Sequence, residues 1–386
     1  MRVLFTFLLS CLTLLASAQS DSVVVSLITC GEGDAIHEYY GHTALRVRKV
    51  DSVQPFDCVF NYGAFDFNKP DFAWLFIKGE TDYTVTMEPT LAFLEYYGAE
   101  RHIQVDEQVL NLTQTEACKL AESLYQNAMA AIQTQWTYRY NFFYDNCVTH
   151  ALDMLTAVFE SEGATIVWPT PKARTLRQIL HESAGKHPAT MLGEDMLLGC
   201  EIDREATLRD QLFSPLYTFE YVKGAKVKRP DGSVKPLVQA PTNLLKDERP
   251  ENHDVVIYYV IVAVIGLLLV ALLVYEKAKK KYFWGIDLAV VSLQALIGTV
   301  IALMFFFSVH PAVDSNWLIL WFNPLWFLDL AYLIFIIRRK HISKTYKHST
   351  AVLTLACGLA FVFGPQSVPV EILAAMGLYI VHLEVN

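Results

Sequence analysis

The stretch VVIYYVIVAVIGLLLVALLVY, residues 255–275, divides this chain of 386 residues into two parts that need different solvents. It contains no charged residue. A helix rises about 1.5 Å per residue, so a helix of this length crosses the hydrocarbon core of a bilayer, which is about 30 Å thick. The stretch is therefore predicted to be a transmembrane helix, and the chain an integral membrane protein.

Four further apolar runs follow, at residues 284–307, 317–337, 349–363 and 368–383. The last two are short and are separated by Gly364-Pro365, so they form either two thin spans or a re-entrant hairpin. We expect two spans. Residues 255–386 are therefore predicted to form an all-α transmembrane bundle of about five helices.

The basic residues of this half indicate its orientation. They are confined to EKAKKKYF (276–283) and RRKHISKTYKH (338–348), whereas SVHPAVDSN (308–316) and GPQS (364–367) contain no Lys or Arg. Short loops rich in Lys and Arg stay in the cytoplasm. The region before residue 255 is then exported, which predicts a multi-pass protein of a bacterial inner membrane with its N-terminal domain in the periplasm.

The N-terminus supports export independently. Residues 1–18 combine Arg2, an apolar run and the small residues Ala16-Ser17-Ala18, which is the pattern of a secretory signal peptide. Cys11 follows Leu-Leu-Ser and imitates a lipoprotein box, which is the alternative reading. We expect cleavage after Ala18, because the apolar run continues past Cys11.

Residues 19–250 are predicted to be an exported α+β domain. Composition and period-two alternation indicate strands at residues 21–29, 44–50, 58–67 and 84–87. Helices are expected at 113–132, where Thr113 and Glu116 can form a capping box, and at 146–159. Asp231-Gly232 indicates a hairpin turn.

Net charge and histidine spacing argue against nucleic acid as a partner and against a zinc-protease site. The formal net charge of −9 offers no basic surface for nucleic acid. His37 and His42 are five residues apart, whereas the helical zinc-protease motif places its two histidines four apart. We expect neither a metal nor another cofactor.

The segment YNFFYDNCVTHALDML, residues 140–155, carries the clearest candidate for chemistry. Asp145 or Asn146 can cap a helix that begins at Cys147. Backbone N–H groups and the dipole at a helix start favour a thiolate, which a cysteine nucleophile needs. A buried structural or disulfide-bonded cysteine would fit this segment equally well.

His42 gives that cysteine a partner. A histidine on an early strand, a polar residue on the next strand and an Asn-Cys pair at a later helix start are similar to a circularly permuted papain-like arrangement. NCVTH resembles the cysteine motif of lecithin:retinol acyltransferase-like thiol acyltransferases. Across nearly the whole chain, the layout resembles the lipoprotein N-acyltransferase (Lnb) family of Bacteroidota, through EYYGH, NYGAFDF, YDNC, HPAVDSNW and NPLWF.

The resemblance implies a reaction and roles. The cysteine of that family takes an acyl chain from a phospholipid as a thioester and passes it to the α-amino group of a lipidated N-terminal cysteine on an exported lipoprotein. Carried onto this chain, Cys147 is the nucleophile and His42 its general base and acid. Asn61 is our choice for the group that orients His42, with Asp66 second.

A polar cluster is also expected at the outer rim of the bundle. The orientation argument puts these residues on the same side as the exported domain, where they are candidates to bind the lipid headgroup or the incoming amine: His310, Asp314, Asn316 and Asn323. Helix caps and turns are the competing explanation, because Asn and Pro serve both.

Two other functions stay open from the sequence. The same cysteine and histidine would serve a papain-like envelope hydrolase or amidase, with water in place of the amine. A non-catalytic assembly module would instead hold Cys147 in a disulfide. The exported domain contains five cysteines, so four can pair and one stays free: Cys30, Cys58, Cys118, Cys147 and Cys200.

Overall fold

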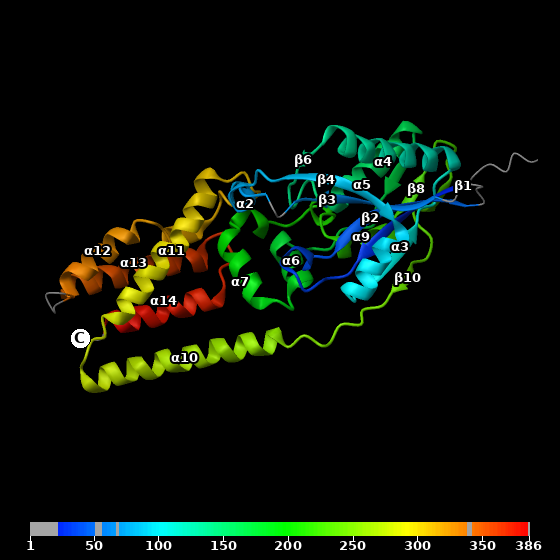
Figure 1. The fold of residues 1–386 in the computed structure, drawn as a ribbon. Coiled ribbons are helices and arrows are strands. Elements are labelled where there is room, and N and C mark those ends of the chain that lie inside the picture. The colour runs from blue at the N-terminus through cyan, green and yellow to red at the C-terminus, as the bar shows by residue number, and fades with distance from the viewer. Residues whose placement is uncertain (1–21, 51–55, 67–68, 338–341, 385–386) are drawn as a thin grey trace, which may run out of the picture.

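The computed structural model describes residues 22–50, 56–66, 69–337 and 342–384. The predicted signal peptide and the alternative at Cys11 lie outside the described residues. Figure 1 shows a sheet-rich body and a body of long helices joined end to end. The sheet-rich body is formed by the N-terminal part of the chain, and the helices by the C-terminal part, in agreement with the predicted fold class.

A seven-stranded antiparallel sheet organises the N-terminal domain, in the order β10-β5-β1-β2-β3-β4-β6. The four predicted strands are confirmed and pair as neighbours in chain order. Its strands are β1 (Ser22–Cys30), β2 (His42–Val50), β3 (Phe56–Ala64), β4 (Asp82–Pro89), β5 (Val105–Val109), β6 (Tyr138–Arg139) and β10 (Thr242–Leu245). A second sheet contains β7 (Thr165–Val167), β8 (Lys226–Lys228) and β9 (Val234–Pro236), the last two forming the hairpin predicted at Asp231-Gly232.

Two helices pack against the large sheet and complete the core. The helix α4 (Gln114–Thr134) begins with the predicted capping box. The Thr113 side chain accepts a hydrogen bond from the Glu116 amide, and the Glu116 side chain accepts one from the Thr113 amide. The helix α5 (Cys147–Ser161) lies against β2 and β3. Leu152 of α5 is buried in the same hydrophobic cluster as Phe60 of β3. Burying such a side chain stabilises the fold by about 1.5–3 kcal/mol, so this packing holds the start of α5 against the sheet.

Shorter elements surround this core. They are η1 (Ile36–Glu38), α2 (Phe72–Lys78), α3 (Thr90–Glu95), η2 (Tyr96–Glu100), α6 (Leu176–Ala184), α7 (Pro188–Leu197), η3 (Cys200–Asp203), α8 (Leu208–Gln211) and α9 (Pro215–Gly224). Of these, α2 and α7 contact the helical body. They are therefore two of the places at which the two bodies meet.

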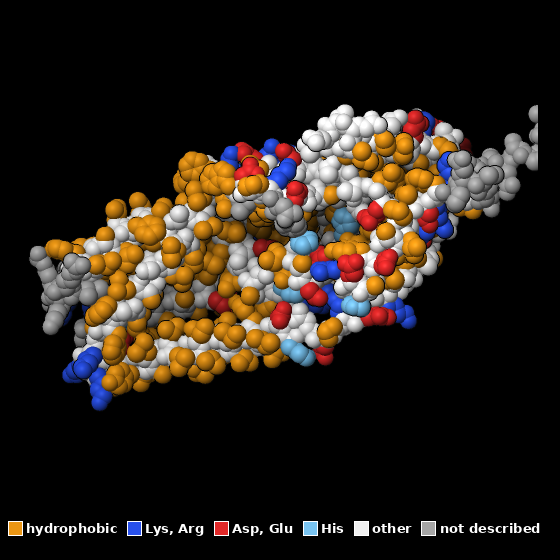
Figure 2. Space-filling model, in the orientation of Figure 1, with side chains coloured by type: hydrophobic (Ala, Val, Ile, Leu, Met, Phe, Trp, Pro, Cys, Tyr) orange, Lys and Arg blue, Asp and Glu red, His pale blue; other side chains and the backbone are white. Residues whose placement is uncertain are grey.

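The C-terminal body contains α10 (Asp254–Lys279), α11 (Gly285–Phe307), η4 (Trp317–Leu320), α12 (Trp326–Ile337), α13 (Lys344–Phe363) and α14 (Val370–Leu383). By length and composition, α10, α11 and α13 are able to cross a membrane, while α12 and α14 are shorter apolar helices. Figure 2 shows apolar side chains covering this body, with basic side chains at the end of α10 that lies far from the sheet. Those basic side chains include Lys277 and Lys279 in the last turn of α10. Their position agrees with the orientation expected from the loop charges.

The third apolar run differs from the prediction. Residues 317–337 do not form one helix: they form η4, a turn, and then the twelve-residue α12. Pro324 has no N–H and disfavours a helical residue before it. The Asn323 side chain accepts from the Leu325 amide at 3.1 Å and donates to the Ile319 carbonyl at 3.3 Å, which satisfies the interrupted backbone.

Candidate active site

Cys147 is the first residue of α5, as the sequence predicts. Asn146 caps this helix: its side-chain oxygen accepts from the amides of Val148 at 2.9 Å and Thr149 at 3.0 Å. Its Nδ2 donates to the Phe213 carbonyl at 2.8 Å, which ties the helix start to the following segment. Cys147 itself is 8% exposed. A buried thiol is thus held at a helix N-terminus, where the dipole favours its ionised form.

His42 is the first residue of β2, and its imidazole lies near enough to Cys147 to stabilise the thiolate. The chain enters β2 through Gly41, which has a φ of +74°. A Cβ at that position would lie 2.6 Å from the Cys30 carbonyl oxygen, so only glycine fits. The turn before β2 therefore sets the place from which the imidazole reaches Cys147.

The two groups shift each other's pKa. Burial alone would raise the pKa of the Cys147 thiol, but the charge and hydrogen bond of His42, with the amides of Thr43 and Val148, lower it below the ordinary value. Burial would lower the pKa of His42, but the Cys147 thiolate and the Asn61 hydrogen bond raise it overall. The geometry thus favours a thiolate–imidazolium pair.

Asn61 on β3 is the partner of His42. Its Oδ1 lies 3.2 Å from Nε2 of His42, and its Nδ2 donates to Oε1 of Glu88 at 2.5 Å. An ionised carboxylate only accepts, so the amide must turn its NH₂ group to Glu88 and its oxygen to His42. The proton of the imidazole is then assigned to Nε2, which leaves Nδ1 free to exchange a proton with the thiol.

Glu88 was missed by the sequence analysis. It lies on β4, where Val59 pairs with Glu88 and Asn61 with Thr86, so Asn61 and Glu88 are diagonal neighbours across two strands. Burial raises the pKa of Glu88, and its contacts with Asn61 and His42 partly offset this. Strand register would have been needed to find it, because nothing in the local sequence links it to His42.

Asp66, the second candidate to orient His42, lies beyond the end of β3 and is exposed. Between Asn61 and Asp66, Gly63 occupies a β-bulge with a φ of +95°. A Cβ there would lie 3.6 Å from the Tyr140 ring and 3.9 Å from the Cys147 Cβ. This glycine brings β3 close to the cysteine beside a pocket of about 40 Å³, which is lined by His37, Tyr40, Gly41, Tyr140, Phe142, Asn146, Cys147, Phe213 and Pro215.

The four polar residues expected at the outer rim differ in exposure and in partners. Asp314 is exposed, whereas Asn316 is buried and caps η4 through the Leu318 amide at 3.0 Å. The Nδ2 of Asn316 donates to the carbonyls of Met196 at 2.7 Å and Leu197 at 3.1 Å, both at the end of α7. Asn316 therefore docks the exported domain onto the helical body.

The other two residues also have protein partners. Asn323 holds the turn before α12, as described above. His310 contacts the Phe76 carbonyl of α2 at 2.5 Å through Nε2. Substrate binding by the outer-rim residues stays a prediction, while the contacts of Asn316, Asn323 and His310 are those of caps, turns and docking.

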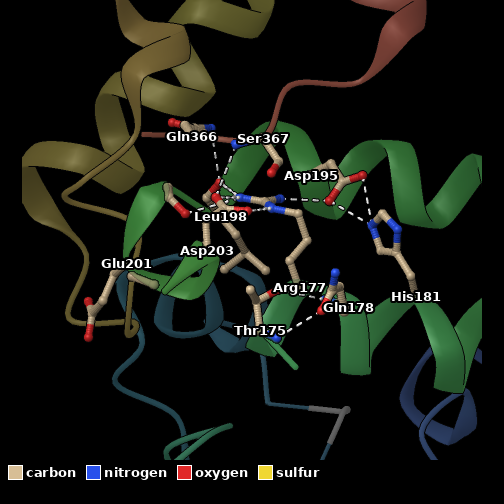
Figure 3. Close-up of polar contacts among 12 residues, drawn as sticks. Thr175, Arg177, Gln178, His181, Asp195, Leu198, Glu201, Asp203, Gln366 and Ser367 are labelled. Carbon is tan, nitrogen blue, oxygen red and sulfur yellow. Dashed lines mark hydrogen bonds and ion pairs between the residues drawn. The ribbon is translucent and has the colours of Figure 1, made fainter. Parts of the chain in front are cut away.

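Arg177 of the exported domain lies at the contact with the helical body, and Figure 3 shows its partners. Its guanidinium bonds Asp203 at 2.8 and 3.0 Å, Asp195 at 2.7 Å, and the carbonyls of Leu198 and Gly199 at 3.1 Å. The loop between α13 and α14 completes the arrangement, because the Ser367 amide donates to Asp203 at 3.2 Å and Gln366 donates to the Leu198 carbonyl at 3.2 Å. A buried guanidinium with several satisfied donors gives this contact a fixed geometry.

The cysteines of the described residues are all free thiols: Cys30, Cys58, Cys118, Cys147, Cys200 and Cys357. A disulfide among those of the exported domain, which the sequence left open, is therefore not formed in this structure. Within residues 22–50, 56–66, 69–337 and 342–384, no group of three or more His, Cys, Asp or Glu side chains is arranged to hold a metal ion.

Comparison with known families agrees with both halves of the chain. Residues 12–182 match the family model described as the Lnb N-terminal periplasmic domain, and residues 251–386 match the one described as the Lnb transmembrane domain. No curated protein and no solved structure matches the chain. The papain-like character of the exported domain therefore stays a prediction. The chain belongs to the Lnb family, as a multi-pass inner-membrane protein whose N-terminal domain lies in the periplasm.

Proposed function

We infer that the protein is a lipoprotein N-acyltransferase, with Cys147 as the nucleophile, His42 as general base and acid, and Asn61 as the residue that orients His42. The observation that carries this proposal is that Cys147, at the start of a buried helix, lies beside His42, whose Nε2 lies 3.2 Å from Oδ1 of Asn61. A nucleophile, a base beside it and a third group that orients the base are the parts that covalent acyl transfer needs. Membership of the Lnb family supports the substrate class.

In the first half-reaction the Cys147 thiolate attacks an ester carbonyl of a phospholipid. A C–S bond forms and the ester C–O bond breaks, so the acyl chain becomes a thioester of Cys147. The leaving alkoxide of the lysophospholipid takes a proton from the His42 imidazolium. The raised pKa of His42 suits this step, because the imidazolium is present when the thiolate attacks.

In the second half-reaction the free α-amino group of a lipidated N-terminal cysteine attacks the thioester. A C–N bond forms, the C–S bond breaks, and the thiolate leaves. His42 takes the proton that the amine loses. The lowered pKa of Cys147 makes the thiolate a better leaving group, and the enzyme returns to its starting protonation state.

Both half-reactions develop negative charge on the carbonyl oxygen. The start of α5 supplies a helix dipole that favours negative charge there, while the amides of Val148 and Thr149 already donate to the Asn146 side chain. The main-chain N–H of Cys147 is our candidate for one donor. Both substrates are lipid-anchored, so a reaction centre fixed to membrane helices on the periplasmic side meets them without extracting either from the bilayer.

The test uses the full-length protein in detergent with a phospholipid and a synthetic diacylglyceryl-cysteine peptide. Mass spectrometry should find the peptide heavier by one acyl chain, and an acyl thioester on Cys147 when the peptide is omitted. A Cys147→Ser variant should give neither product. Free fatty acid without acylated peptide would instead identify an envelope hydrolase, and equal lipoprotein N-termini in cells with and without the protein would exclude the proposed reaction.

A further inference from the structure

Five aromatic side chains form a continuous row from Cys147 to the outer end of the helical body. Tyr140, which lines the pocket at Cys147, stacks on Tyr83 with ring centroids 4.3 Å apart. Tyr83 contacts Phe65 at 4.8 Å, and Phe65 stacks on Phe72 at 5.5 Å. Phe72 contacts Phe76 one turn along α2, at 5.9 Å. We refer to Tyr140, Tyr83, Phe65, Phe72 and Phe76 as the aromatic row.

The far end of the row is fixed to the membrane part of the protein. The Val309 amide, just after α11, donates to the Lys78 carbonyl of α2 at 2.8 Å. The ring of His310 lies 5.5 Å from that of Phe76. Gly79 ends α2 with a φ of +71°, and a Cβ there would lie 2.8 Å from the His310 amide. Figure 1 shows α2 beside the end of α11 that faces the exported domain.

Apolar surface is exposed where the row meets the helical body. Trp74 and Phe76 of α2 are 53% and 50% exposed, although they belong to the periplasmic domain. Phe306 and Phe307, in the last turn of α11, are 66% and 67% exposed. Aromatic side chains gathered at the end of a membrane span are typical of the bilayer interface. The row therefore ends where the outer leaflet of the membrane begins.

We propose that the aromatic row is the binding site for the acyl chain of the donor phospholipid. The chain lies along Tyr140, Tyr83, Phe65, Phe72 and Phe76, with its ester carbonyl at Cys147 and its end toward the outer leaflet. This inference rests on the proposed function, because it names the site that the first half-reaction needs.

The size of the pocket at Cys147 supports a route of this kind. Its volume of about 40 Å³ is far too small for a long acyl chain, so a chain attached to Cys147 has to extend out of the pocket. On another side of the pocket, the Tyr40 hydroxyl donates a hydrogen bond to the carboxyl group of Glu194. This polar pair is a poor surface for methylene groups. The aromatic row instead offers continuous apolar faces, and burial of each methylene group against them is favourable.

The experiment compares two donors that differ only in acyl length, dipalmitoyl and dihexanoyl phosphatidylethanolamine, with the full-length protein in detergent. Phe76→Ser changes a half-exposed side chain, so it should leave folding intact, and Phe72→Ser interrupts the middle of the row. Each should slow acyl-thioester formation from the long-chain donor by about tenfold or more, because it removes apolar contact. Each should leave the rate with the short-chain donor within about twofold, since the short chain does not reach α2.

Two controls keep the result specific. Phe72→Leu retains an apolar side chain and should keep most of the long-chain rate. Tyr125→Ser replaces an exposed aromatic on α4, away from the row, and should change neither rate. Alkylation of Cys147 by iodoacetamide at the wild-type rate shows that the pocket is intact.

Equal loss with both donors, or no loss with either, overturns the acyl-chain site while leaving the proposed function in place. Failure of the unmodified protein to form a thioester with either donor rejects the proposed function itself. The two hypotheses are therefore tested separately.

Discussion

Asn61 donates through Nδ2 to Oε1 of Glu88 at 2.5 Å, so its amide group has one orientation. Without that acceptor, the amide is able to turn its NH₂ group toward His42. The imidazole would then keep its proton on Nδ1, and that nitrogen would no longer be free to accept one from the thiol. Glu88 is thus a positioning residue that acts through Asn61.

We predict that Glu88→Leu slows acyl transfer by about tenfold, equivalent to about 1.4 kcal/mol and comparable to one lost hydrogen bond. The effect should fall on kcat rather than KM, and the pH profile of Cys147 alkylation should move to higher pH. Glu88→Gln keeps an acceptor for the Asn61 amide and should retain most of the activity. Equal impairment of the Gln and Leu variants would argue for a role of the charge instead.

The nucleophile and its base should act as one unit. We predict that Cys147→Ser and His42→Ala each reduce turnover to background, and that the double variant is no slower than the single ones, because residues of one catalytic unit have non-additive effects. The assay is peptide acylation measured by mass spectrometry. Losses that multiply in the double variant would show that the two side chains work separately.

The pKa shifts predict how Cys147 reacts with pH. The pKa of Cys147 is lowered and that of His42 is raised, because each group stabilises the charged form of the other. Alkylation by iodoacetamide should therefore extend to lower pH than for an ordinary thiol and decrease as pH falls through the folded pKa of Cys147. In His42→Ala the burial of the thiol is no longer opposed by the imidazole, so alkylation should need a higher pH. The same profile in both proteins would contradict the ion pair.

Arg177 should contribute strongly to stability at the contact between the two bodies. Lysine is a single point charge and cannot replace a guanidinium that bonds Asp195, Asp203 and two carbonyls at once. We predict that Arg177→Lys destabilises the full-length protein by about 3–5 kcal/mol, the usual result of breaking a buried ion pair. Thermal unfolding in detergent measures this. Arg174→Lys is the control, because Arg174 pairs with Glu182 at the surface and its replacement should have little effect.

Local sequence was sufficient for the parts of the site that depend on neighbouring residues. The cap at Asn146 and the thiol at Cys147 follow from three consecutive positions, and the capping box at Thr113 follows from two residues three apart. His42 required one further step, the resemblance that joined it to Cys147. Glu88 required the register of β3 against β4, which period-two alternation does not specify.

The outer loop shows a second limit of the sequence. Asn316 was predicted to bind substrate, with a helix cap as the alternative; in the structure it caps η4, and its other partners are carbonyls of α7, about 120 residues away in sequence. From sequence alone, an amide that binds the protein backbone cannot be told from one that binds a ligand, because both occur as a polar residue among apolar ones. Likewise, residues 317–337 were predicted as one span, whereas in the structure α12 begins only after Pro324, at Trp326.

A close contact between the two bodies, at Gly199, gives the last prediction. Gly199 precedes η3 and donates its amide to the Ala312 carbonyl of the outer loop at 2.7 Å. A Cβ at Gly199 would lie 2.3 Å from the Ser315 carbonyl carbon, so alanine cannot be accommodated unless the exported domain and the outer loop move apart.

Gly193, on α7, offers a matched control, since a Cβ there meets nothing within 4 Å. We predict that Gly199→Ala reduces transfer from phospholipid in vesicles by about tenfold or more, because a small displacement of a positioned nucleophile is enough to lose that factor. Alkylation of Cys147 in the same variant should be unchanged, and Gly193→Ala should behave like the unmodified protein. Full transfer by Gly199→Ala would mean that the helical body only tethers the periplasmic domain. Loss of transfer with an intact thiol would show that the two bodies must be docked for Cys147 to reach a lipid in the bilayer.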